Sequence, residues 1–443
     1  MKNIIFGPPG TGKTHKLLSI VEEALAKGID PDQIGYFAYT RRAATEAITR
    51  AVNQFPQYDK KDFKYFRTLH SLAYMELGLN DSSLMDDEDY KEMSGLLKAK
   101  ISNPANKYDN YGTGWQDDKF VNIVDLARIK DVSLEHQFCQ PSTGHLIGGF
   151  QKLRKIASGL EKYKKQNGFL DFTDMILEFV KRGMSPKFRL LIIDEAQDLS
   201  AIQWSMVDLL CKNATRIYIA GDDDQAIFEW AGADPWQFKQ QKGNRIILNQ
   251  SYRVPLAVQD RANSVISRIN SRVEKYWNAT DREGLLKFQP NPYRNIDFLK
   301  DDWLILARTN YILDKVEEEL KTYNYHELVN DYGLLLPQAM QWDEALDRIS
   351  PTRVAYLLAS LRRNQNLNHE AKVRLSTIHG SKGGEASNVL LFSQLSHRVD
   401  EGYRKNRDAE RRVFYVGMTR AKKELHMVRS ENNKEFSEMF WRI

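Results

Sequence analysis

The chain has 443 residues, 42% hydrophobic and 28% charged, which is an ordinary globular composition and enough length for roughly two to four domains. Lysine and arginine number 64 against 59 aspartates and glutamates, and the net charge of +5 permits a polyanionic partner without requiring one. The two cysteines, Cys139 and Cys211, lie far apart and outside any Cys/His cluster, so neither a disulfide framework nor a zinc site is indicated.

The first expected element is a buried strand at residues 4–6, followed by a glycine-rich loop and a helix with apolar residues from Leu17 to Leu25. The loop meets every fixed position of G-x-x-x-x-G-K-[ST]. Backbone N–H groups of such a loop face phosphate oxygens, the lysine reaches the outer phosphates and the threonine hydroxyl binds Mg²⁺. A glycine-rich turn without a ligand is the less favoured alternative. The loop residues are Gly7, Pro8, Pro9, Gly10, Thr11, Gly12, Lys13 and Thr14.

Only three residues precede this strand, too few for a secretory signal, and no later stretch approaches the ~18 apolar residues of a membrane span. We therefore expect a soluble, cytoplasmic protein with no membrane partner.

Two short strands are expected next, at residues 34–39 and 65–70. The first ends at Tyr39 and leads into Thr40, which caps a helix that begins with two arginines. The second carries a Thr/His pair that ends with His70. Open α/β sheets bind ligands at the carboxyl ends of their strands. The alternative for the first pattern is a capped helix with solvated arginines, and each pattern taken singly is weak evidence.

Residues 77–165 are expected to form a mostly helical insertion, because no comparable strand and loop appears there. An acidic run at 86–89 opens one helix, and residues 151–167 form a basic one. A solvated helix face is the favoured explanation of the basic run, ahead of a surface that follows phosphates. Its basic residues are Lys152, Arg154, Lys155, Lys162, Lys164 and Lys165.

The α/β pattern resumes at residues 190–193, four aliphatic residues typical of a strand buried on both faces. Asp194 and Glu195 follow at its carboxyl end. Asp194 is suited to hold Mg²⁺ through water, and Glu195 to accept the proton of an attacking water. Together with the glycine-rich loop, this pair favours an ATPase over a nucleotide switch without turnover.

A further strand at residues 217–220 leads into a loop that ends at Gln225, a candidate sensor of the γ-phosphate. Phe228 and Trp230 follow within one turn, so a loop that responds to the nucleotide would also present rings on which bases stack. Both rings have a core alternative, which for Phe228 is equally favoured. Tyr252 and Arg253 come soon after.

The second half repeats the pattern, with strands expected at 303–308, 373–376, 389–392 and 425–428 and a helix at 314–320. This predicts a second parallel α/β domain.

Taken together, the motifs resemble those of superfamily 1 helicases of the UvrD/Rep/PcrA group, in the family's order and over nearly the whole chain. The motifs are the glycine-rich loop, residues 39–41, 67–70, 171–174, 194–197, 221–230, 250–253, 373–385 and 409–422.

The resemblance implies two RecA-like domains that bind ATP between them, with a single nucleic-acid strand across both. The domains are expected at residues 1–76 and 166–250 for the first, interrupted by the insertion at 77–165, and at 251–443 for the second. For the nucleotide, the resemblance implies that Lys13 binds phosphate, that Thr14 and Asp194 bind Mg²⁺, and that Glu195 acts on the attacking water. Gln225 is expected to contact the γ-phosphate, Tyr252 to stack on adenine and Glu385 to bind the nucleotide. Arg253 and Arg420 are the two arginines expected to reach the nucleotide from the other domain. For the nucleic acid, it assigns Tyr39, Thr40, His70, Trp230 and His379.

The chain also departs from the family pattern. Larger members insert an accessory domain where this chain has only a reduced segment, around residues 311–370, and they carry an adenine-reading glutamine segment for which no room precedes the loop here. Ala231 stands where the family tends to have arginine, and Gly384 and Ala386 replace bulky residues beside Glu385.

The resemblance thus implies an ATP- and Mg²⁺-dependent 3′-to-5′ translocase and helicase on single-stranded DNA, with single strands and single/double-strand junctions as partners. The alternative is an NTP-driven motor that binds DNA or displaces proteins, and that does not unwind unless a protein partner helps. A nucleotide switch without nucleic acid is the third hypothesis, and it predicts ATPase activity indifferent to single strands.

Overall fold

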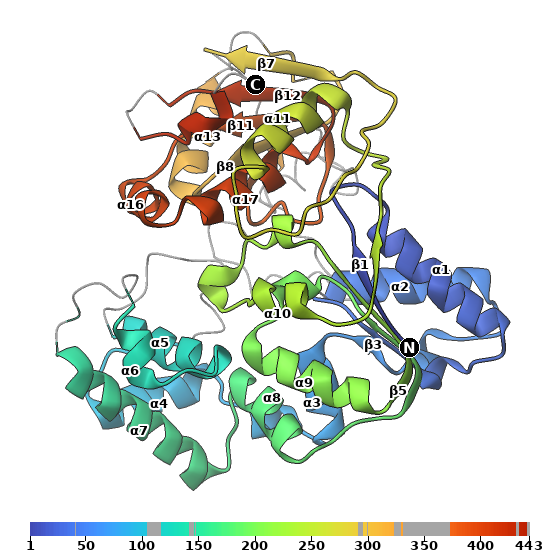
Figure 1. Ribbon diagram of the computed structural model, residues 1–443. Coiled ribbons are helices and arrows are strands. Elements are labelled where there is room, and N and C mark those ends of the chain that lie inside the picture. Colours follow the sequence, from blue (N-terminus) through green and yellow to red (C-terminus); the bar gives the residue numbers. More distant parts are fainter. Residues whose placement is uncertain are drawn as a thin grey trace, which may run out of the picture. The chain divides into compact units, whose positions relative to one another are not determined.

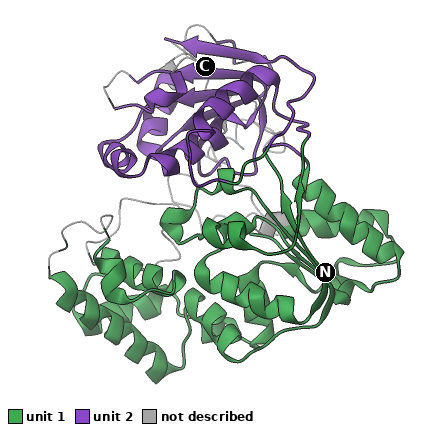
Figure 2. Ribbon diagram, in the orientation of Figure 1, with its two compact units in different colours: residues 1–8, 12–249, 273–275 green, residues 9–11, 250–272, 276–443 purple. Residues whose placement is uncertain are grey.

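The computed structural model describes residues 1–39, 41–103, 117–140, 146, 148–290, 296–298, 300–322, 329–330, 373–430 and 434–440. These residues form two compact units (Figure 2). The first unit contains residues 1–8, 12–249 and 273–275, and the second contains 9–11, 250–272 and 276–443. Thr40 and most of the segment expected as a reduced insertion lie outside the described residues. The finer domain boundaries remain a prediction.

The first unit is built on a six-stranded sheet in which every recorded strand pairing is parallel, in the order β3-β2-β4-β5-β1-β6. The expected apolar runs are its central strands, and they are buried on both faces, as parallel strands covered by helices must be. The edge strand β6 was not anticipated. The strands are β1 (Lys2–Phe6), β2 (Ile34–Phe37), β3 (Phe66–Arg67), β4 (Phe188–Ile193), β5 (Ala214–Gly221) and β6 (Asn244–Ile247).

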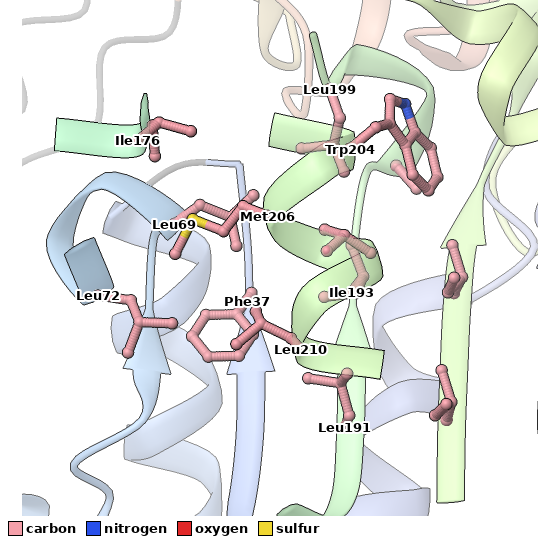
Figure 3. Packing of buried hydrophobic residues seen from close by; sticks show 14 of the residues in the cluster. Phe37, Leu69, Leu72, Ile176, Leu191, Ile193, Leu199, Trp204, Met206 and Leu210 are labelled. Carbon is pink, nitrogen blue, oxygen red and sulfur yellow. The ribbon is translucent and has the colours of Figure 1, made fainter. Parts of the chain in front are cut away.

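Helices cover both faces of this sheet, and the alternation of side chains along the strands divides the core in two (Figure 1). Leu191 and Ile193 pack with α3, α8 and α9, whereas Leu190 and Ile192 pack with α1 and α2. Figure 3 shows part of the first cluster, in which Phe37 comes from a strand and Leu69 and Leu210 from two helices. The helices outside the insertion are α1 (Lys13–Ala26), α2 (Arg41–Gln54), α3 (Leu69–Glu76), α8 (Phe172–Lys181), α9 (Ala201–Lys212) and α10 (Pro235–Gln240).

The expected insertion is helical where it is described, and its helices enclose a hydrophobic cluster of their own. One expectation for its basic stretch is wrong. Lys164 is not solvated: its ammonium lies 2.6 Å from carboxylates of both Asp171 and Asp174. Asp171 caps α8 and also pairs with Arg128, so these charges fasten the insertion to the body of the first unit. The insertion helices are α4 (Asp87–Leu97), α5 (Asp118–Ile129), α6 (Leu134–Phe138) and α7 (Gly149–Asn167).

The second unit contains another sheet, in which every recorded strand pairing is parallel, in the order β7-β12-β11-β8-β10-β9. Leu390 packs with α13 on one face, while Leu391 meets Gly417 of α17 on the other. The strands are β7 (Leu285–Gln289), β8 (Trp303–Ala307), β9 (Val329–Asn330), β10 (Val373–Thr377), β11 (Ala386–Phe392) and β12 (Ala421–Val428). The helices are α11 (Leu256–Ile266), α13 (Asn310–Thr322), α16 (His397–Lys405) and α17 (Arg407–Met418).

The expected α/β class with two parallel sheets is therefore confirmed. Among the helices that the structure describes, none combines the length and the apolar character needed to cross a membrane.

Candidate functional site

The glycine-rich loop connects the carboxyl end of β1 to α1, whose first residue is Lys13. Gly10 has φ +71°, in the left-handed region that favours glycine. A Cβ added there would lie 2.4 Å from the Cβ of Arg253, so space as well as conformation demands glycine. Residues 9–11 belong to the second unit. There the N–H of Tyr252 donates a hydrogen bond of 2.8 Å to the carbonyl of Gly10, and the hydroxyl of Ser251 donates one of 2.9 Å to the carbonyl of Pro9.

Lys13 meets both acids that follow β4. Its Nζ lies 2.6 Å from Oε1 of Glu195 and 3.5 Å from Oδ1 of Asp194. Burial alone would lower the pKa of Lys13, but the two carboxylates outweigh it and raise that pKa above its ordinary value. The side chain is therefore an ammonium at neutral pH, held at the start of a helix, where anions are favoured.

Asp194 is buried at the carboxyl end of β4 and accepts hydrogen bonds from the Tyr36 hydroxyl and from the N–H of Glu195. Burial raises the pKa of Asp194, while Lys13 opposes this rise. Thr14, the second residue of α1, offers a hydroxyl. A carboxylate and a hydroxyl suit Mg²⁺, which keeps several waters and takes further oxygens from phosphates. In the described part of the chain, no three or more His, Cys, Asp or Glu side chains gather around a possible metal position.

Glu195 adopts φ +52°, an uncommon conformation for a residue with a side chain, and such conformations concentrate at functional sites. One of its oxygens holds Lys13, and the other accepts a hydrogen bond of 2.5 Å from the Gln197 amide. The Glu195 side chain is 33% exposed, so water can reach this carboxylate.

A hydrogen-bonded chain continues from Gln197 to the candidate phosphate sensor. The amide oxygen of Gln197 accepts the N–H of Asp222 at 2.9 Å, and Oδ2 of Asp222 accepts Nε2 of Gln225 at 2.8 Å. Lys13, Glu195, Gln197, Asp222 and Gln225 are thus linked in series. The sequence interpretation gave Gln197 and Asp222 no role, although Gln197 lies in the motif at 194–197 and Asp222 in the one at 221–230.

Three aromatic rings lie together beyond this loop. Tyr39 stacks on Phe228 with ring centroids 5.6 Å apart, and Phe228 lies 6.4 Å from Trp230. Tyr39 is 37% exposed and Trp230 is 39% exposed. Phe228 is partly buried between them, which suits a ring that supports its neighbours. We call Tyr39, Phe228 and Trp230 the aromatic group.

His70 lies on α3 beside the exposed ring of Phe172, with centroids 5.7 Å apart. Burial lowers the pKa of His70 to about 4, so its ring is neutral at physiological pH. A neutral imidazole contacts a base or a sugar by hydrogen bonding or stacking, not by charge. Phe172 follows the helix cap Asp171 and lies in the motif at 171–174, but the sequence interpretation gave it no role.

In the second unit, Glu385 gathers two cations. Its Oε2 lies 2.6 Å from the guanidinium of Arg253, and its Oε1 lies 2.6 Å from Nζ of Lys422. Burial opposes ionisation, but Lys422 and Arg253 hold the pKa of Glu385 below its ordinary value. Tyr252, next to Arg253, has a ring that is 72% exposed and available for stacking.

Arg420 is 2% exposed and donates to the carbonyls of Val416 and Gly384, at 2.9 and 3.2 Å. Gly384 precedes Glu385, so Arg420 and the Glu385 cluster adjoin in the second unit. His379 lies elsewhere, two residues beyond the carboxyl end of β10. Of the residues proposed for nucleic acid, Thr40 alone lies outside the described part of the chain.

Models of two domain families match the chain. Residues 1–245 match the model of the UvrD/REP helicase N-terminal domain, and residues 349–432 match that of the UvrD-like helicase C-terminal domain.

Three relatives illustrate the similarity. A "Probable DNA helicase II homolog" of Mycoplasma pneumoniae is 26% identical over 375 residues, which cover 72% of this chain and 50% of the relative. A second protein of that organism, "Probable DNA helicase", is 24% identical over 96% of this chain and 80% of its own length. The "ATP-dependent DNA helicase PcrA" of Staphylococcus aureus is 23% identical over 62% of this chain and 39% of its own length.

This chain thus spans about half the length of the first relative and about four fifths of the second. Because the N-terminal model alone matches more than half of its residues, the chain belongs to the UvrD/REP helicase family.

Proposed function

We propose that the protein is an ATP-dependent DNA helicase that moves along single-stranded DNA in the 3′-to-5′ direction. Family membership supports the chemistry, and the family resemblance supports the polarity. The observation that carries the proposal is the hydrogen-bonded series from Lys13 through Glu195, Gln197 and Asp222 to Gln225. It joins a phosphate-binding lysine to the loop that leads directly into Trp230.

In the proposed reaction, Lys13 binds the outer phosphates, and Thr14 and Asp194 hold Mg²⁺. The metal, when bound, neutralises charge that develops on the phosphate oxygens. Lys13 now pairs with Glu195, so phosphate oxygens that draw the ammonium away release Oε1 of Glu195 to orient and deprotonate water. Gln225 then senses the γ-phosphate with an amide that Asp222 already orients.

The second unit supplies cations in this proposal. Arg253 and Arg420 stabilise transition-state charge, Tyr252 stacks on the base and Glu385 contributes to nucleotide binding. The ion pair with Glu385 orients Arg253, and Lys422 pairs with the other oxygen of that carboxylate. Since arginines of this kind act mainly in the transition state, they affect turnover more than affinity.

For the nucleic acid, Tyr39 and Trp230 present stacking faces, and Thr40, His70 and His379 contribute further contacts. Stacking tolerates any base, as a translocating protein requires. Single strands and junctions are the proposed DNA partners, with a regulatory protein partner if unwinding needs one.

The test has two stages. Steady-state ATPase rates are measured with and without single-stranded DNA, and strand displacement is measured on duplexes with a 3′ or a 5′ single-stranded tail. We expect single strands to stimulate ATPase, and 3′-tailed duplexes to be unwound. An ATPase indifferent to single strands would overturn the proposal, unwinding from 5′ tails alone would overturn the polarity, and stimulation without displacement would identify a motor that does not unwind by itself.

A further inference from the structure

Three consecutive aspartates after β5 form a buried acidic group that the proposed chemistry has used only in part. Asp222, Asp223 and Asp224 are all 0% exposed. Lys275 reaches all three: its Nζ lies 3.0 Å from Asp222, 2.5 Å from Asp223 and 3.0 Å from Asp224. The Lys275 side chain is 1% exposed, so this interaction is shielded from water and salt.

Lys275 arrives on a short segment that we call the strap, residues 273–275. The strap belongs to the first unit, whereas residues 250–272 before it and 276–443 after it belong to the second. Besides Lys275, the strap contributes the N–H of Val273, which donates to Oδ2 of Asp223 at 2.8 Å. The Val273 side chain also packs against a hydrophobic cluster of the first unit. Charge, hydrogen bonding and burial therefore all hold the strap in place.

The charges explain why a lysine stands there. Three carboxylates without water repel one another, and each is costly to bury without a partner. Burial raises the pKa of Asp222 in spite of Lys275, and the adjacent carboxylates raise the pKa of Lys275 against the opposing effect of its own burial. The acids are tolerated at this position because one ammonium touches all of them.

Asp222 connects this group to the sensor. Its Oδ1 lies 3.0 Å from Lys275, its Oδ2 accepts Nε2 of Gln225 at 2.8 Å, and its N–H donates to Gln197. Oδ1 also accepts the N–H of Asp224 at 3.2 Å, so the ammonium and this N–H together fix the direction in which Oδ2 meets the Gln225 amide.

We infer that Lys275 is a positioning residue for turnover, which acts by orienting Asp222 and through it the γ-phosphate sensor Gln225. This inference rests on the proposed function. Arg272 and Tyr276 on either side of the strap belong to the second unit, so the strap is also a covalent link between that unit and the sensor loop.

The test is a double-mutant cycle with Lys275→Met, Gln225→Ala and the double variant, each assayed for kcat at saturating single-stranded DNA and for the Kd of a fluorescent ATP analogue. Misplaced catalytic groups cost up to about 10²-fold, so we expect each single substitution to lower kcat about 10–100-fold and to change Kd by less than about threefold. If Lys275 acts through Gln225, the double variant will be no more than about threefold slower than the slower single variant. Effects on kcat that multiply, or a loss confined to Kd and melting temperature, would overturn the inference.

A charge-matched variant guards against misfolding. Lys275→Met combined with Asp223→Asn keeps the wild-type excess of two negative charges but removes the ammonium from Asp222. We expect it to fold and to keep the kcat defect. Recovery of wild-type kcat would overturn the inference, and so would failure of both variants to fold, since Lys275 would then be required for the fold and not for positioning.

The matched control is Lys164→Met, because Lys164 also bridges two aspartates of the first unit, the buried Asp171 and the partly buried Asp174, neither of which belongs to the sensor loop. Any effect it has should multiply with that of Gln225→Ala. If DNA stimulates the wild-type ATPase but the effects of Lys275→Met and Gln225→Ala multiply, the inference about Lys275 is wrong and the proposed function stands. If the wild type does not turn over ATP, the proposed function falls with it.

Discussion

The two sheets share one architecture but carry their candidate nucleotide residues at opposite ends. In the first unit, these residues follow the carboxyl ends of strands: Lys13 after β1, Glu195 after β4 and Gln225 after β5. In the second, Glu385 directly precedes β11 and Arg420 directly precedes β12, at the amino ends. In that sheet, the carboxyl end of β10 leads instead to His379, a candidate for nucleic acid.

The chemistry differs as well as the position. The candidate residues of the first unit combine one lysine with several carboxylates, whereas Glu385 of the second is surrounded by Arg253 and Lys422, with Arg420 nearby. A phosphate chain needs both: carboxylates for the metal and for water, and cations for developing charge. The same fold can therefore serve complementary roles, because its two copies carry opposite charge at opposite ends of their strands.

The largest expected effect belongs to the cations that adjoin Glu385 and Gly384 in the second unit. We expect Arg253→Ala and Arg420→Ala each to lower kcat by about 10³-fold, with nucleotide affinity changed much less, because the charge is needed in the transition state. Single-turnover ATP hydrolysis and analogue binding measure the two effects. The control is Arg308→Ala: Arg308 pairs with Glu410 but follows β8, at the carboxyl edge of the same sheet, and its loss should leave kcat within about threefold. Equal effects of all three substitutions would refute the distinction between edges.

The carboxyl edge of the first unit is tested by Glu195→Gln. We expect kcat to fall by about 10²-fold or more, because a general base is lost, while ATP still binds through Lys13. Chemical-quench hydrolysis measures kcat, and binding of an ATP analogue in the presence of DNA measures the nucleotide affinity. Glu178→Gln, which removes a surface pair with Lys181, is the control and should behave as wild type. A glutamine variant with wild-type kcat would remove Glu195 from the chemistry.

The aromatic group is the proposed stacking surface for nucleic acid on the first unit. Trp230→Ala should weaken single-strand binding by about 1–3 kcal/mol with little dependence on base sequence, while basal ATPase survives. Fluorescence anisotropy with oligonucleotides of different composition measures it. Trp236→Ala removes another exposed tryptophan of the same unit, outside the aromatic group, and should leave affinity unchanged. Intact affinity accompanied by a large drop in melting temperature would mean that Trp230 serves the core.

The smallest expected effect concerns His70, whose folded-state pKa of about 4 lies below the ordinary value of 6.5. The unfolded chain binds the proton more readily, so this ring's contribution to stability is complete above pH 6.5 and is lost as pH falls toward 4. We expect His70→Gln to reduce the loss of unfolding free energy between pH 7 and pH 5.5 by about 1 kcal/mol, measured by urea titration. The exposed His136, changed in the same way, is the control. Identical pH profiles for wild type and His70→Gln would exclude this role.

The strands and loops of the site were predictable because their signals are local. Apolar runs such as residues 190–193 predict a strand without reference to any other part of the chain, and the spacing of glycines and lysine in the loop predicts a phosphate-binding conformation. The edge strands β6 and β7 escaped because a strand at the margin of a sheet does not need a continuous apolar run. The exposure of Lys164 was predicted wrongly because a basic helix face does not reveal which carboxylates pack against it, here those of Asp171 and Asp174.

The parts of the site that the sequence did not predict are those that depend on contacts between residues far apart in the chain. Gln197 lies in a motif, but its link to Asp222 exists only once β4 and β5 are paired. Lys275 gives no local signal at all, since it is defined by acids some fifty positions earlier.

The strap has a practical meaning for anyone who wishes to dissect the protein. A cut after Asn249 looks natural, because the matched N-terminal region ends at residue 245. Such a fragment would retain Asp222, Asp223 and Asp224 but leave their lysine on the discarded piece, and a buried ion pair that loses one member costs about 3–5 kcal/mol. An isolated N-terminal fragment of this protein is therefore expected to be less stable than its hydrophobic core suggests, and a peptide that restores residues 273–275 is a rational way to complement it.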